Sequence, residues 1–157
     1  MEKYMEEALR EARAAAQDGD VPVGCFIVRD GQIVGRGRNR VEADHDPTAH
    51  AEIAAIREAV RAVGRERLTG CTMYVTLEPC SMCAGAIVLA RVDRLVIAAS
   101  DPKTGACGSV YNIVEDPKLN HRVEVIRGMM EEEAAGLLKE FFADLRLTKK
   151  EKKGNQA

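Results

Sequence analysis

The sequence predicts a single α/β domain in which helices cover a mixed β-sheet. Stretches with apolar residues at helical spacing alternate with short apolar runs typical of buried strands, in the order αββαβαβ, an irregular stretch and then βα. The strand–helix–strand–helix–strand middle favours parallel pairing. The length of 157 residues and the hydrophobic content of 46% suit one core. We expect one domain at residues 1–147 and a disordered basic tail at 148–157.

The first part of the chain predicts a helix followed by a hairpin. Residues 2–17 have the apolar spacing of an amphipathic helix. The run at 23–28 is apolar throughout and suits a strand that is buried on both faces. Asp30 and Gly31 are typical of a two-residue hairpin turn, so residues 32–37 should return antiparallel to the first strand.

The middle of the chain predicts two helices that alternate with two strands. A helix opens at Asp46-Pro47-Thr48, with Pro near its first position, and it ends before Gly64. Residues 72–77 form a strand, and Pro79 starts a third helix that runs to about residue 91. Residues 95–99 form the next strand.

The last third predicts an irregular stretch, a strand and a closing helix. Residues 100–121 are rich in Asp, Gly, Pro and Asn, with one helical turn expected near Val110. Residues 122–126 suit a strand, and residues 131–147 suit a helix. One face of that helix is apolar and consists of Leu137, Leu138, Phe141, Phe142 and Leu145.

The segment at 84–90 is apolar on all sides of its expected helix. Such a helix must be covered on every side, and one sheet face of a small domain cannot do this alone. Either a second subunit or a neighbouring helix of the same chain covers the rest, and the pattern favours neither. A homodimer is therefore one of two expectations from this segment.

Charge and cysteine content limit the possible partners and the location. Charged residues make up 31% of the chain with a net charge of −2, so a nucleic-acid partner would need a local basic patch. The N-terminal segment is acidic and lacks the apolar stretch of a signal peptide, and no run is long enough to cross a membrane. We expect a cytoplasmic protein without membrane contact. Its five cysteines then favour metal binding or free thiols over disulfides.

Three residues have the chemistry and spacing of a zinc site. Cys80 and Cys83 lie three apart in the first turn of a helix, where the helix dipole favours thiolates. His50 adds an imidazole, and two thiolates with one imidazole suit Zn²⁺. His50 and Glu52, two apart, can both approach the metal only at the N-terminal end of their helix. The sequence therefore predicts two helix N-termini that meet at one metal.

The number of ligands distinguishes a catalytic zinc from a structural one. Structural sites have four protein ligands, whereas three ligands leave a position for water, whose pKa zinc lowers to about 7. Glu52, as a carboxylate that is not a ligand, would carry the proton of that water. The alternative is a closed zinc knuckle or an accidental CxxC. Cys25, Cys71 or Cys107 could supply a fourth ligand, although such cysteines are more often plain thiols.

The motifs HAE at 50–52 and PCSMC at 79–83 resemble the signature of zinc-dependent nucleoside and nucleobase deaminases. Within that family the chain is similar to the bacterial tRNA adenosine deaminases over nearly its whole length. The resemblance rests on VPVG (21–24), GRN (37–39), DPTAHAEI (46–53), MYVTLEPC (73–80), MCAGA (82–86), DPKTGACGS (101–109), LNHRVEV (119–125) and KEFFADLR (139–146).

This resemblance implies a fold and an activity. The fold would be the cytidine-deaminase-like three-layer α/β/α arrangement with a mixed five-stranded sheet, assembled as a homodimer with one Zn²⁺ per subunit. The activity would be hydrolytic deamination of adenosine to inosine at the wobble position of a tRNA anticodon stem-loop, with ammonia released. Glu52 would be the catalytic proton carrier, while His50, Cys80 and Cys83 would hold the zinc.

The resemblance also implies contacts to the RNA. Asn39 matches a residue that hydrogen-bonds the target nucleotide, although an Asn here could instead support a turn. Asp101 and Lys103 belong to a loop that contacts nucleic acid in similar proteins, and Phe142 and Arg146 lie on a helix that borders the RNA. Each charge could equally be a solvated surface residue, and Phe142 suits the core better than a platform for base stacking.

Two other functions are compatible with the motifs. A guanine, cytosine or free-nucleoside deaminase would share the metal chemistry, and only the DPKTG loop and the C-terminal helix argue against it, by resemblance. A zinc-stabilised RNA-binding module without catalysis would have no need of the carboxylate at Glu52.

Overall fold

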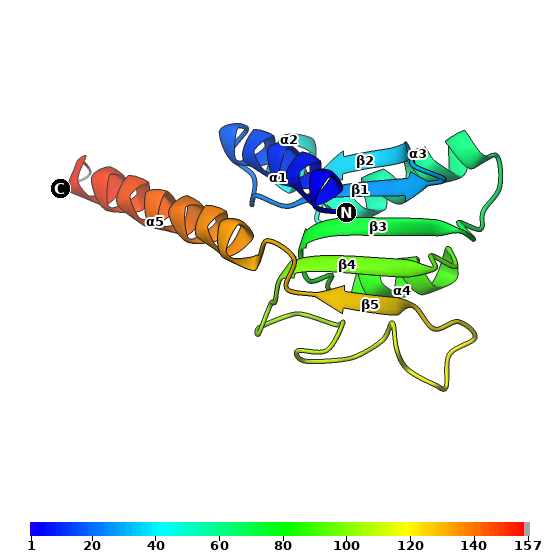
Figure 1. Ribbon diagram of the computed structural model, residues 1–157. Coiled ribbons are helices and arrows are strands. Elements are labelled where there is room, and N and C mark those ends of the chain that lie inside the picture. The colour runs from blue at the N-terminus through cyan, green and yellow to red at the C-terminus, as the bar shows by residue number, and fades with distance from the viewer. Residues whose placement is uncertain (156–157) are drawn as a thin grey trace.

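The computed structural model describes residues 1–155 and shows a mixed sheet between two pairs of helices (Figure 1). The elements are α1 (Glu2–Gln17), β1 (Gly24–Arg29), β2 (Gln32–Arg38), α2 (Val41–Asp44), α3 (Ala51–Val63), β3 (Cys71–Leu77), α4 (Ser81–Leu89), β4 (Arg94–Ala99), β5 (Glu124–Arg127) and α5 (Glu131–Asn155). The five strands lie in the order β2-β1-β3-β4-β5. β1 is antiparallel to β2 and β3, whereas β3, β4 and β5 are parallel. The three-layer fold with a mixed five-stranded sheet is therefore confirmed.

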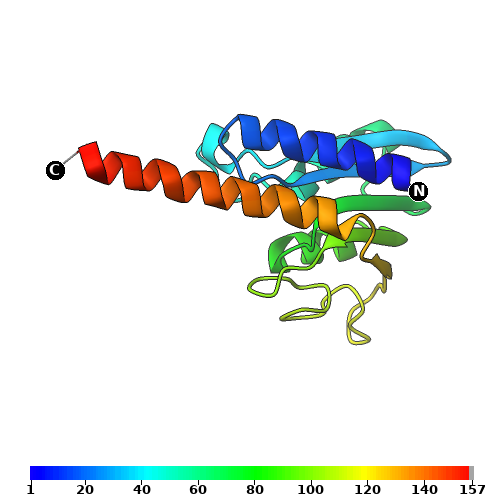
Figure 2. The same ribbon diagram turned by 60° about the vertical axis from the view of Figure 1, so that its left-hand side comes forward.

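Each face of the sheet has its own apolar cluster. One cluster joins the sheet to α3 and α4, through residues such as Ala55 and Ile87. The other joins it to α1 and the first turns of α5, through residues such as Leu9 and Ala134. Figure 2 shows α1 and α5 side by side in front of the sheet.

The edge strand β2 lies very close to α3, and this contact places the N-terminal end of α3. A Cβ atom at Gly37 would lie 2.2 Å from the carbonyl oxygen of Ala51, the first residue of α3. A Cβ atom at Gly35 would lie 2.3 Å from the carbonyl oxygen of Ala55, one turn further on. Because only glycine leaves room for this approach, the two glycines hold the start of α3 against the sheet.

Two differences from the predicted elements surround the start of α3. The helix begins at Ala51 rather than at Asp46, because the Asp46 carboxylate accepts hydrogen bonds from the backbone and the hydroxyl of Thr48 and forms a turn instead. The short helix α2 was not predicted, since four residues show no periodicity. The buried carboxylate of Asp20 accepts from the backbone N–H groups of Glu42 and Ala43 and caps this helix.

The C-terminal region also differs. No helical turn forms near Val110 in the described residues, where Cys107 and Asn112 instead form an isolated bridge. The expected disordered tail is wrong for residues 148–155, because α5 continues to Asn155 and projects from the body (Figure 1). This segment is mostly Lys and Glu, which are good helix formers, and it contains no Pro. Residues 156–157 of the expected tail lie outside the described residues.

α4 is only partly covered by its own chain. Ala84, Ile87 and Val88 are buried against the sheet and α3, but Leu89 is 80% exposed. A neighbouring helix of the same chain therefore does not complete the burial of α4. Among the described residues, no helix is long and apolar enough to cross a membrane.

Candidate active site

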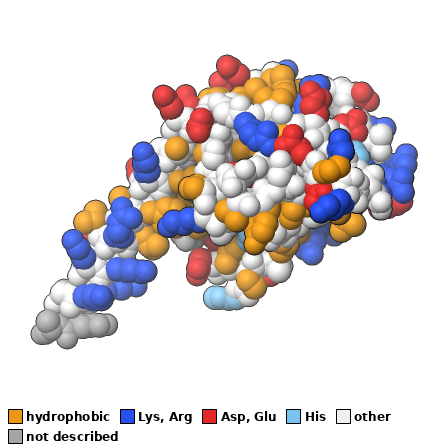
Figure 3. All heavy atoms as spheres, turned by 90° about the horizontal axis from the view of Figure 1, so that it is seen from below, with side chains coloured by type: hydrophobic (Ala, Val, Ile, Leu, Met, Phe, Trp, Pro, Cys, Tyr) orange, Lys and Arg blue, Asp and Glu red, His pale blue; other side chains and the backbone are white. Residues whose placement is uncertain are grey.

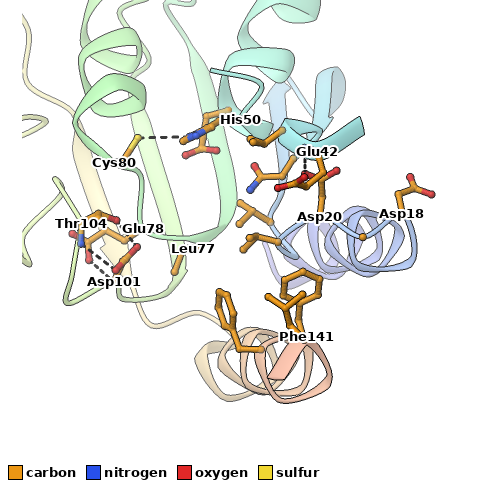
Figure 4. Close-up of a pocket in the computed structure, with 18 of the residues that line it drawn as sticks. Asp18, Asp20, Glu42, His50, Leu77, Glu78, Cys80, Asp101, Thr104 and Phe141 are labelled. Atoms are coloured by element: carbon orange, nitrogen blue, oxygen red, sulfur yellow. Dashed lines mark hydrogen bonds between the residues drawn. The ribbon is translucent and has the colours of Figure 1, made fainter. Parts of the chain in front are cut away.

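A cavity of about 740 Å³ opens between the sheet edge, the loops at its carboxyl end and α5 (Figure 4). His50, Glu52 and Cys80 line it, and Phe141 on α5 faces His50 and Cys80 from the opposite side. The remaining walls come from the segment after α1, from α2, and from the chain around Leu77 and Asp101. The cavity thus combines residues from six separate segments, which only the folded chain brings together.

The two predicted helix N-termini do meet. His50 is the N-cap of α3 and Cys80 is the N-cap of α4, with Cys83 at the third helical position. The Nδ1 atom of His50 lies 3.6 Å from Sγ of Cys80 and 3.5 Å from Sγ of Cys83. The three possible ligand atoms all lie within 4.8 Å of one another.

This cluster fits zinc. A tetrahedral ion with nitrogen at about 2.0 Å and sulfur at about 2.3 Å holds those two ligand atoms about 3.5 Å apart. The observed nitrogen–sulfur separations of 3.6 Å and 3.5 Å agree with this value. Cys25, Cys71 and Cys107 are not part of the cluster, so a fourth protein ligand is absent from the described residues. The geometry is that of an open site with three protein ligands.

The electrostatics of the cluster favour a cation. Hydrogen bonds from Cys83 and His50 lower the pKa of the Cys80 thiol to about 3, so this sulfur is a thiolate at neutral pH. The pKa of Cys83 is raised, first by its hydrogen bond to the Cys80 thiolate and then by burial. The pKa of His50 is raised by its hydrogen bond to Cys80. A bound dication reverses the preference at Cys83, because it deprotonates a coordinating thiol.

Glu52 lies directly beside the cluster. It occupies the second position of α3, is 3% exposed, and lines the cavity. Burial raises the pKa of its carboxyl group, and the nearby His50 partly opposes this shift. A carboxyl group can accept and donate a proton in turn, and a raised pKa favours the protonated form that donates.

Asn39 lines the cavity and also makes a contact with α3 that the sequence did not predict. Its Oδ1 atom accepts a hydrogen bond of 2.9 Å from the backbone N–H of Ala51 and so caps α3. Asn39 also lines the cavity near His50. Because the oxygen is held by the helix, the amide N–H₂ group is the part left for a ligand.

The loop that contains Asp101 and Lys103 forms one wall of the cavity. The Asp101 carboxylate accepts from the backbone of Lys103 and from the backbone and hydroxyl of Thr104, so it is engaged within its own turn. Asp101 and Thr104 line the cavity. Lys103 faces a neighbouring groove instead, together with Lys139, Phe142 and Arg146 of α5.

The expectation that Phe142 belongs to the core is wrong. Its side chain is 40% exposed and stands between the cavity and the groove, with its ring 5.5 Å from that of Phe141. The helical pattern alone could not show this, because α5 leaves the body of the protein before its apolar face ends. Leu145 and Leu147 are exposed for the same reason.

Glu78 is a site residue that sequence reasoning did not single out. It directly precedes Pro79 and Cys80, lines the cavity, and is 5% exposed. Burial alone would raise the pKa of its carboxyl group, but the hydroxyl of Ser109 and three backbone N–H groups donate to it and lower that pKa. Its place next to the PCxxC motif was the only signal in the sequence.

The fold and the cluster together define a zinc-dependent deaminase. The family described as the cytidine and deoxycytidylate deaminase zinc-binding region matches residues 1–99, and the chain belongs to this family. It is a hydrolytic zinc enzyme.

Individual relatives narrow the class. The chain is 47% identical over 154 residues to the tRNA-specific adenosine deaminase of Bacillus subtilis, covering 98% of this chain and 96% of the relative. It is 48% identical, with a TM-score of 0.83, to a structure from a study of A-to-I editing by tRNA:A34 deaminases; 87% of this chain and 99% of that chain are covered. A guanine deaminase structure from Nitrosomonas europaea has a TM-score of 0.79 at 25% identity, covering 90% and 84% of the two chains.

Proposed function

We propose that this chain deaminates adenosine to inosine at the wobble position of a tRNA anticodon. The similarity to tRNA-specific adenosine deaminases carries this proposal, because it reaches 47% identity over nearly the full length of both chains. The similarity to the guanine deaminase structure is much lower, at 25% identity. The residues of the cavity support the same chemistry and assign it to individual side chains.

The proposed roles of the metal cluster and of Glu52 follow from the positions and the chemistry of these side chains. His50, Cys80 and Cys83 would hold one zinc ion, and zinc supplies Lewis-acid activation of a water molecule. Glu52 would accept a proton from the attacking water, deliver it to N1 of adenine, and later help to protonate the amine that leaves C6 as ammonia. Its burial beside the cluster keeps these transfers away from bulk water.

The cavity has room and polarity for a base that has left its stack. Its volume of about 740 Å³ lies within the range of about 300–1,000 Å³ that is usual for small-molecule sites. Asn39 would direct its amide N–H₂ group toward the nucleotide, because Oδ1 already accepts from Ala51. Phe142, exposed at the rim, would contact neighbouring bases.

A basic stripe along α5 would contact the RNA backbone. At 3.6 residues per turn, the stripe residues fall within an arc of about 100° on the helix, and the acidic residues Glu140, Asp144 and Glu151 lie on the opposite side. The basic residues of the stripe are Lys139, Arg146, Lys149, Lys150 and Lys153, and Phe142 lies on the same side of the helix. Lys149 lines the cavity, and Lys103 joins Arg146 in the groove beside it. Figure 3 shows Lys and Arg side chains along the projecting helix.

Assembly and location are part of the proposal. A homodimer would cover the outer side of α4, where Met82 and Leu89 are 36% and 80% exposed. A tRNA substrate fits a cytoplasmic protein. We propose that residues 1–147 form one deaminase domain, to which the helical end of α5 adds basic residues.

The test is a comparison of substrates. The zinc-loaded protein is incubated separately with an anticodon stem-loop that carries adenosine at the wobble position, with the same stem-loop carrying guanosine there, and with free adenosine, guanine and cytosine. Ammonia release from the adenosine stem-loop alone supports the proposal. Release from free guanine or cytosine would show a nucleobase deaminase, and RNA binding without any release would show a non-catalytic module.

A further inference from the structure

Glu78 has no direct role in the proposed chemistry, but it lies between the metal cluster and the loop at 101–109. The residue directly follows β3, at the start of the connection to α4. Its backbone N–H donates a hydrogen bond of 2.8 Å to the carbonyl of Ala99, the last residue of β4. Two residues later the chain reaches Cys80. Any movement of Glu78 is therefore passed along a very short connection to a proposed zinc ligand.

The carboxylate of Glu78 is enclosed by the loop at 101–109. Its Oε1 atom accepts from the backbone N–H of Asp101 at 3.1 Å and from the hydroxyl of Ser109. Its Oε2 atom accepts from the backbone N–H groups of Cys107 at 3.0 Å and Ser109 at 3.1 Å. No salt bridge joins Glu78 to a cation within residues 1–155, so the loop itself compensates the buried charge.

The fit between loop and carboxylate is tight. A Cβ atom at Gly105 would lie 2.3 Å from Oε2 of Glu78 and 2.5 Å from the carbonyl oxygen of Asp101. The neighbouring backbone N–H of Ala106 donates to the carbonyl of Pro79 at 2.8 Å. Consequently the loop holds both residues that precede Cys80.

We infer that Glu78 is a positioning residue, which holds the zinc ligand Cys80 and the Asp101–Thr104 wall of the cavity in one defined relation. The backbone of Glu78 leads through Pro79 to the metal cluster, and both oxygens of its carboxylate bind the loop that lines the substrate cavity. This inference rests on the proposed function for its catalytic consequence. Its effect on the metal does not depend on which substrate the enzyme accepts.

The variant Glu78→Gln tests the inference with little change of shape. A glutamine has one acceptor oxygen, so its amide N–H₂ group must face donors. In the Oε2 position the amide group would face two backbone N–H groups, neither of which can accept a hydrogen bond. In the Oε1 position it would face the Ser109 hydroxyl, which can turn and accept one. The amide should therefore take the Oε1 position and leave the N–H of Asp101 without its partner. Amide hydrogen exchange should rise at Asp101 more than at Cys107.

The metal readout needs no RNA. Loss of a group that orients a zinc ligand costs about 10–100-fold in metal affinity or activity. Competition with a chromogenic chelator should show zinc binding weakened by this factor in Glu78→Gln, and by less in Glu78→Asp, which retains the charge and both oxygens. In single-turnover deamination of an anticodon stem-loop, the rate at saturation should fall within the same range while the half-saturating RNA concentration changes little.

A matched control separates positioning from stability. Glu115→Gln removes a carboxylate of the same 100–121 segment that accepts from Asn112 and Arg127 but does not line the cavity. Measured well below both melting temperatures, Glu115→Gln should keep zinc affinity near that of the original chain. Equal zinc affinity in Glu78→Gln and Glu115→Gln would overturn the inference.

A second variant keeps the test decisive if Glu78→Gln does not fold. Gly105→Ala pushes the loop away from the same carboxylate and leaves Glu78 unchanged. It should weaken zinc binding in the same direction, and unchanged binding in a folded Gly105→Ala protein would also contradict the inference. If zinc affinity falls as expected but no substrate is deaminated by the original chain, the positioning role stands and the proposed function fails.

Discussion

Removal of zinc should expose one cysteine with unusual reactivity. The pKa of Cys80 is lowered to about 3 in the metal-free cluster, and this thiol is only half-buried. The other four cysteines, Cys25, Cys71, Cys83 and Cys107, are 0% exposed, and their pKa values are raised. We therefore expect a disulfide reagent to modify the metal-free protein at Cys80 alone and to leave the zinc-loaded protein unmodified.

The size of the expected difference in reaction rate between Cys80 and a free thiol depends on pH. An ordinary thiol with a pKa of about 8.5 is about 3% thiolate at pH 7, whereas Cys80 is fully ionised, a gain of about 30-fold. A thiolate with so low a pKa is less nucleophilic than an ordinary thiolate, by about 300-fold. Cys80 should thus react about tenfold more slowly than a free thiol at pH 7 and about tenfold faster at pH 5.

The assay is a stopped-flow measurement with an aromatic disulfide at pH 5 to 8, followed by peptide mass analysis. Because the pKa is lowered, the thiolate persists down to about pH 3 and the rate should be flat across this range. A free thiol, in contrast, gains about tenfold per pH unit below its pKa. A rate at Cys80 that rises in this ordinary way, or modification at Cys71 or Cys107 first, would refute the electrostatic description of the cluster.

Two further predictions concern RNA contact and assembly. If the α5 stripe contacts phosphates, Arg146→Ala and Lys153→Ala should each reduce the slope of log affinity against log salt concentration by up to about 0.7. Glu140→Gln, on the opposite side of the helix, should not reduce this slope. The same slope in all three variants would exclude the stripe as the RNA-binding surface. Leu89→Arg should convert the proposed homodimer into a monomer with zinc still bound, as measured by light scattering and metal analysis. A dimer that persists unchanged in this variant would show that α4 lies outside the interface.

The metal cluster could be predicted from the sequence because its chemistry is local. Cys80 and Cys83 share one helical turn, and the separation of His50 and Glu52 by two residues is useful only at a helix end. The structure shows His50 and Cys80 as the two N-caps, one residue outside the regular helices. The order of elements likewise followed from hydrophobic periodicity, which reports which residues face the core.

The features that could not be predicted depend on contacts between segments far apart in the sequence, which hydrophobic periodicity does not report. Glu78 appears as one more charged residue until the loop at 101–109 folds over it, and Asp20 appears as part of a turn until α2 lies on its carboxylate. The exposure of Phe142 depends on where α5 leaves the body, whereas its helical spacing is that of a core residue. The tail was predicted from composition as disordered, although its Lys and Glu residues equally suit a helix.

Deamination at the wobble base, with Glu52 as the proton carrier, is the central claim. Glu52→Gln preserves the shape of the side chain but cannot carry a proton, and general acid–base catalysis contributes about 10²–10⁴-fold. The direct measurement is sequencing of tRNA after single-turnover incubation with either protein, since inosine is read as G in place of A. The zinc-loaded original chain should convert the wobble adenosine, while Glu52→Gln should be at least about 10²-fold slower, with zinc content and RNA affinity retained. Conversion by Glu52→Gln at a near-normal rate, or no conversion by the original chain, would contradict the account.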